Sequence, residues 1–156
     1  MNNKDIKVLE KVYENVDDHD WSVISPVDEY YSEIDYPMDA KKSGNVYYSE
    51  VKKGLIIITG TYQIRFYYEE DNFTWEKKYF SSIISDINSN PSNIAFITNE
   101  DYENMIAKKD LFNLSKNIEK KFGIERPNII VALYDFVNRK VSGVDDLYSD
   151  FLNDDE

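Results

Sequence analysis

The chain has 156 residues, a formal net charge of −12 and no cysteine, and 42% of its residues are hydrophobic and 15% aromatic. This apolar content excludes a disordered chain, and the length fits one domain, residues 1–156, with a sizeable core. Without cysteine, the sequence excludes disulfides, thiolate nucleophiles, zinc ribbons and iron–sulfur clusters.

The N-terminal 40 residues predict two helices. Residues 4–16 carry apolar side chains at helical spacing and predict an amphipathic helix. We expect a second helix over residues 26–36, because Ser25 can cap it and Pro26 suits its first position. The side chains expected to face the core from this helix are Val27, Tyr31 and Ile34.

An antiparallel sheet is predicted in the middle of the chain. The clearest signal is the alternation of residues 61–68, where one face carries Tyr62, Ile64, Phe66 and Tyr68. The other expected strands are residues 46–51, 55–59, 73–80 and 94–98. A short helix is expected over residues 80–87, from the spacing of its isoleucines.

The C-terminal part predicts a group of helices. Thr98 and Asp101 resemble a capping box for a helix that begins near Asn99, and Asp110 is a potential cap for a helix that ends at Gly123. Residues 127–142 favour a helix by spacing, although their apolar run also suits a buried strand. A last short helix is expected over residues 144–151. The whole pattern predicts a single α+β domain: an acidic, helical N-terminal segment (1–40), an antiparallel meander of three to five strands at about 45–98, and C-terminal helices at about 99–152.

The sequence shows no pattern typical of a catalytic, metal or cofactor site. The single histidine, His19, has no second histidine or cysteine beside it, and adjacent acidic residues do not face each other on a helix. The glycines are scattered and form no phosphate-binding loop. We therefore expect no enzyme, no metal and no cofactor. The N-terminus lacks the apolar core of a signal peptide, and no apolar run approaches a membrane span, so we expect a cytoplasmic protein without membrane contact.

The negative charge gathers at both ends of the chain. Residues 1–40 contain 11 acidic and 3 basic residues, and residues 124–156 contain 8 and 3. Tyrosines stand among these carboxylates, and charge that guides an encounter beside rings that supply contact area suits a basic partner protein. The residues predicted to bind it are Asp28, Glu29, Tyr30, Glu33, Asp35, Asp145, Asp146, Tyr148 and Asp150.

These features favour a small acidic protein that inhibits a basic partner by stoichiometric occlusion. The basic partner would be a toxin or a nucleic-acid enzyme, because such proteins bind phosphates in basic clefts. The chain would then be a bacterial immunity protein, or a phage-encoded antagonist or nucleic-acid mimic. The alternatives are a regulatory or structural interaction domain and, less favoured, a carboxylate-based hydrolase. Direct binding of nucleic acid is not expected from so acidic a chain.

Overall fold

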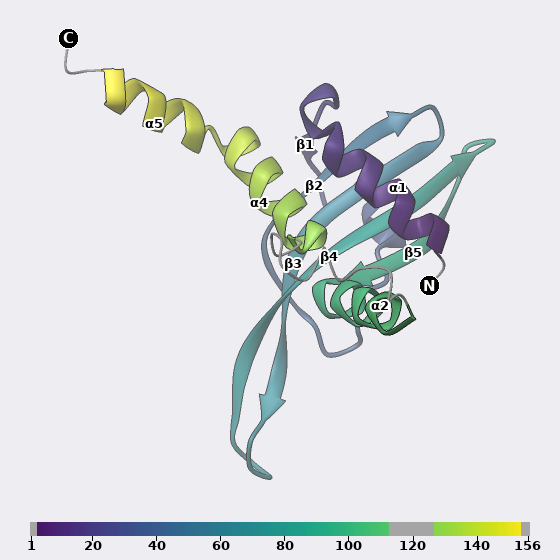
Figure 1. Ribbon diagram of the computed structural model, residues 1–156, viewed down its shortest axis with the longest axis vertical. Coiled ribbons are helices and arrows are strands. Elements are labelled where there is room, and N and C mark those ends of the chain that lie inside the picture. Colours follow the sequence, from purple (N-terminus) through teal and green to yellow (C-terminus); the bar gives the residue numbers. More distant parts are fainter. Residues whose placement is uncertain (1–2, 113–126, 154–156) are drawn as a thin grey trace.

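A five-stranded antiparallel sheet forms the centre of the computed structural model, which describes residues 3–112 and 127–153, without the side chains of 109–112 (Figure 1). Each strand pairs with the next along the chain, so the sheet is a simple meander. The strands are β1 (Ser22–Val23), β2 (Lys41–Lys52), β3 (Leu55–Tyr67), β4 (Phe73–Ile87) and β5 (Asn90–Thr98). The predicted α+β meander is confirmed, with longer strands than the sequence suggested.

Four α-helices are described around this sheet: α1 (Asn3–Glu14), α2 (Asn99–Phe112), α4 (Ile129–Ser142) and α5 (Val144–Asn153). The predicted helices at the N-terminus, after Thr98 and after Gly143 are confirmed, and residues 127–142 adopt the helical alternative. A short 3-10 turn, η1 (Val16–Asp18), follows α1. The predicted helix start at Asp110 is wrong, because α2 continues through this residue to Phe112, and the rest of the helix expected to end at Gly123 lies outside the described residues.

The two faces of the sheet support two separate cores. On the first face, Ile57, Ile83 and Ile97 pack against α1, α2 and α4. On the second face, Ile56, Ile58, Phe80 and Ile84 pack against the irregular segment between β1 and β2. Neighbouring residues of one strand belong to different cores because side chains alternate across a sheet.

The predicted helix over residues 26–36 is wrong. The segment consists of turns and one 3-10 turn, η2 (Tyr31–Glu33), and Val27 is 94% exposed. The Asp28 carboxylate accepts a hydrogen bond from the backbone N–H of Tyr30 (2.9 Å), a local turn that competes with helix formation. The segment instead spans the second face of the sheet and buries Ile34 there.

The predicted helix over residues 80–87 is also wrong, because this stretch is the second half of β4. Both faces of the sheet are covered here, so Phe80 and Ile84 enter one core and Ile83 enters the other. A strand buried on both faces shows a run of apolar residues instead of alternation, and such a run imitates helical spacing.

The outer parts of β3 and β4 form a hairpin that extends beyond the rest of the sheet (Figure 1). The described register ends with Lys41 of β2 opposite Gln63, and with Thr98 of β5 opposite Phe80. Beyond these points β3 and β4 pair only with each other among the described strands, as far as Tyr67 opposite Phe73.

Candidate binding surfaces

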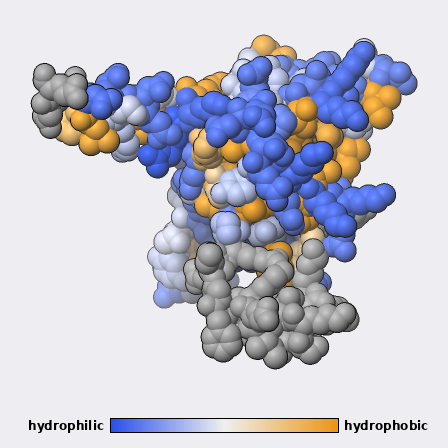
Figure 2. All heavy atoms as spheres, turned by 45° about the horizontal axis from the view of Figure 1, so that its top comes forward, coloured by the Kyte–Doolittle hydropathy of each residue, from blue (hydrophilic) through white to orange (hydrophobic). Residues whose placement is uncertain are grey.

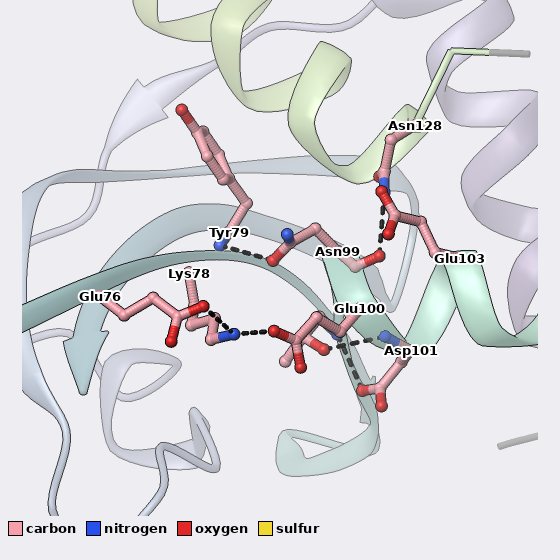
Figure 3. Close-up of polar contacts among 9 residues, drawn as sticks. Glu76, Lys78, Tyr79, Asn99, Glu100, Asp101, Glu103 and Asn128 are labelled. Atoms are coloured by element: carbon pink, nitrogen blue, oxygen red, sulfur yellow. Dashed lines mark hydrogen bonds and ion pairs between the residues drawn. The ribbon is translucent and has the colours of Figure 1, made fainter. Parts of the chain in front are cut away.

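The start of α4 is held in place by Asn128. Its side-chain oxygen accepts hydrogen bonds from the N–H groups of Ile130 (3.1 Å) and Val131 (3.4 Å), as in a helix N-cap. Its amide nitrogen donates to the backbone oxygen of Asn99 (2.9 Å), and the Asn99 side chain accepts from the N–H of Tyr79 (3.1 Å). Figure 3 shows how this chain of bonds joins α4, α2 and β4.

A buried lysine fixes the start of α2 to the sheet. Lys78 of β4 forms ion pairs with Glu76 (2.9 Å) and with Glu100, the second residue of α2 (Figure 3). The predicted capping box is confirmed, because Thr98 and Asp101 exchange hydrogen bonds between side chain and backbone. The carboxylates of Glu76, Glu100 and Asp101 all bind groups within the fold. We therefore assign them a role in stabilising the fold and not in binding a partner.

A glycine separates α4 from α5. Gly143 has a φ of 79°, a left-handed conformation that ends α4, and its N–H donates to the backbone oxygen of Arg139. Arg139 also binds the Asp145 carboxylate (2.9 Å) and lies over the ring of Tyr148 (5.6 Å). From this joint α5 extends away from the sheet (Figure 1).

α5 presents an uncovered apolar stripe. None of its residues, 144–153, is buried, and Phe151 and Leu152 are 74% and 73% exposed. Figure 2 shows apolar and hydrophilic side chains on opposite sides of this projecting arm. Helical spacing gathers the apolar side chains on one side, places the carboxylates of Asp145 and Asp150 along the two edges of that side, and leaves Asp146 on the opposite side. The α5 stripe consists of Val144, Leu147, Tyr148, Phe151 and Leu152.

The first predicted acidic segment is more constrained than the sequence suggested. The Tyr30 hydroxyl donates a 2.6 Å hydrogen bond to the Asp86 carboxylate, and this bond, with burial, raises the pKa of Tyr30 above its usual value. Its ring lies against Tyr48, so Tyr30 is held by the sheet. Asp28 and Glu33 are half-buried, whereas Glu29 and Asp35 are exposed.

The two predicted acidic segments, residues 28–35 and α5, belong to different layers of the molecule. Residues 28–35 belong to the segment that covers the second face of the sheet, whereas α4, from which α5 extends, packs on the first. Of the two segments, α5 alone combines exposed carboxylates with exposed apolar side chains in one regular element.

The projecting hairpin carries a further candidate surface, which was not among those predicted from the sequence. Residues paired across β3 and β4 share a face, and Lys41 lies opposite Gln63. The resulting hairpin face consists of Lys41, Gln63, Arg65, Tyr67, Phe73, Trp75 and Lys77. The signal was present in the alternation of the two strands, which places cations and rings at positions of the same parity.

Within the described residues, no group of three or more histidine, aspartate or glutamate side chains is arranged to hold a metal ion. No described helix is long and apolar enough to cross a membrane. Comparisons with protein-family models, with curated proteins and with solved structures find no match.

Proposed function

We propose that the chain is a cytoplasmic binding protein that covers a basic surface of a partner protein, with α5 as its docking element. The observation that carries this proposal is the uncovered α5 stripe with carboxylates beside it. An amphipathic helix that places its apolar side in a groove is a common mode of protein recognition. Carboxylates beside the stripe select a groove with a basic rim.

The proposed consequence of binding is occlusion of the partner. A basic cleft that normally holds phosphates attracts a chain with a net charge of −12, and a docked helix excludes the usual ligand. An immunity protein or a phage-encoded antagonist would act in this way. The exposed carboxylates of Glu29 and Asp35 would add to the attraction at longer range, without direct contact.

The non-inhibitory alternative uses the same surface. A regulatory or structural interaction domain would also dock through α5, and it would leave the partner's activity unchanged on binding. An activity assay of the identified partner, with and without one equivalent of the chain, therefore separates the two.

The partner can be sought by cross-linking from α5 itself. A photo-reactive benzophenone side chain in place of Ser149, which lies beside the stripe, would be introduced in the cells that encode the chain. We expect an adduct with a basic protein, and binding of that purified protein at equal stoichiometry. An adduct with an acidic protein, or a purified partner that does not bind, would contradict the proposal.

Binding kinetics test the role of the charges. Asp146→Lys with Asp150→Lys should slow association on the order of tenfold at low salt, and the loss should shrink at high salt as the charges are screened. The matched control is Asp18→Lys with Asp20→Lys, which changes the net charge equally at two exposed residues, the last residue of η1 and a residue shortly after it. Equal effects of the two double variants would show that only net charge matters and that α5 is not the contact.

A further inference from the structure

The hairpin face is a cationic surface on an acidic chain. It carries three cations, Lys41, Arg65 and Lys77, and the described residues on this face include no carboxylate. Glu76 projects to the opposite side, where it pairs with Lys78, and the acidic residues 69–71 lie in the turn at the tip. The hairpin face therefore differs in sign from the chain as a whole, whose net charge is −12.

The cations and the rings of the hairpin face are packed together. Lys41 lies 5.3 Å from the centre of the Trp75 ring, and the Arg65 guanidinium lies 4.9 Å from that of Phe73. Phe73 and Trp75 meet edge to face at 87°. Tyr67, Phe73 and Trp75 remain exposed. A surface of this kind offers apolar contact and positive charge together, which matches an apolar helix bordered by carboxylates.

We propose that the α5 stripe of one copy of the chain docks on the hairpin face of a second copy, and that the two copies do so reciprocally. The dimensions agree: Val144 to Leu152 spans about 12 Å along a helix, and Gln63 to Tyr67 spans about 14 Å along a strand. In this arrangement the exposed carboxylate of Asp150, which borders the stripe, lies close to the cations of the hairpin face. Reciprocal docking closes a two-fold dimer and leaves neither surface exposed.

The α5 that docks on the hairpin face is more readily supplied by a second copy than by the same chain. α5 and the hairpin leave the body of the molecule in different directions (Figure 1), so within one copy the α5 stripe does not reach the hairpin face. Single-stranded nucleic acid is a weaker candidate, because bases need free ring faces and here cations lie over Phe73 and Trp75.

The salt dependence of this dimer differs from that of partner binding. Two copies of net charge −12 repel each other at long range, and salt screens this long-range repulsion more than the few close carboxylate–cation contacts at the interface, while the apolar contact persists. We expect the dimer to strengthen from low to moderate salt, opposite to the binding of a basic partner. The inference is independent of the proposed function, although a basic partner and a second copy would compete for α5.

Cross-linking between two single-cysteine variants tests the contact, because the natural chain contains no cysteine. Ser149→Cys on α5 and Gln63→Cys on the hairpin face would be mixed and treated with a short bismaleimide. The matched control replaces Gln63→Cys with Thr74→Cys on the opposite side of the hairpin. We expect cross-linked heterodimers from the first mixture and few from the control.

Sedimentation over a concentration series measures the association itself. Phe151→Asp and Arg65→Glu should each weaken the dimer at least about tenfold, since each removes a central contact from both docking sites. An equal mixture of the two variants retains one intact docking site, and should associate more tightly than either variant alone.

Three results would overturn the inference. These are a chain that stays monomeric at all concentrations, cross-links that form only between two α5 helices, and a mixture that associates no better than its components. Tight binding of a single-stranded oligonucleotide by a monomeric chain, lost in Trp75→Ala, would instead assign the hairpin face to nucleic acid. Loss of the dimer in Arg65→Glu with unchanged binding of a basic partner would leave the proposed function standing.

Discussion

α4 and α5 are consecutive amphipathic helices, and they differ in what covers their apolar sides. α4 buries Ile130, Leu133 and Val137 against the sheet, whereas α5 buries none of its ten residues. Asn128 caps the start of α4 and is hydrogen-bonded to α2, and α5 begins after Gly143, where the chain turns away from the sheet. The periodic spacing of apolar residues thus shows that both helices have an apolar side. Whether the chain itself buries that side depends on the residues at the helix ends, here Asn128 and Gly143.

Truncation of one apolar side chain in each helix should show the largest difference. Leu133→Ala should lower the free energy of unfolding by about 2–5 kcal/mol, because Leu133 is 1% exposed and its removal leaves a cavity. Phe151→Ala should change it by less than about 0.5 kcal/mol, since the ring is mostly in solvent. Urea unfolding at low protein concentration measures both. A comparable loss in Phe151→Ala would mean that α5 is covered within one chain.

Removal of the cap should have an intermediate effect. Asn128→Ala deletes an acceptor for two helix N–H groups and a donor to Asn99, and should cost about 1–2 kcal/mol. Asn153→Ala makes the same chemical change at the exposed end of α5, and serves as the control with an expected effect below about 0.5 kcal/mol. If the two variants unfold at the same urea concentration, Asn128 does not anchor α4 as described.

The sequence predicted the elements whose signals are local. The helix at 4–16, the capping box of Thr98 and Asp101, and the alternation of residues 61–68 all depend on neighbours in the chain, and all are confirmed. The errors at 26–36 and 80–87 have a non-local cause. Ile34 and Ile84 face the second core, and a chain read residue by residue does not show that the sheet is covered on both sides.

The candidate binding surfaces were less predictable from the sequence than the secondary structure was. Asp145, Asp146, Tyr148 and Asp150 lie on an exposed helix, as expected, but the apolar residues between them belong to the same surface. Tyr30 looked like an exposed anchor, and its bond to Asp86, 56 residues away, could not be inferred from the local sequence. The hairpin face required the register of β3 and β4, which places Arg65 opposite Trp75.

The smallest expected effect concerns the joint between the two helices. Gly143 has a φ of 79°, and a Cβ added there would meet no atom within 4 Å, so Gly143→Ala adds backbone strain without a steric clash. The expected cost is about 1 kcal/mol in urea unfolding, and Gly143→Asn should cost less because asparagine tolerates the left-handed conformation better. If Gly143→Ala is as stable as the natural chain, this position does not need the left-handed conformation, and the separation of the covered α4 from the exposed α5 would not depend on this glycine.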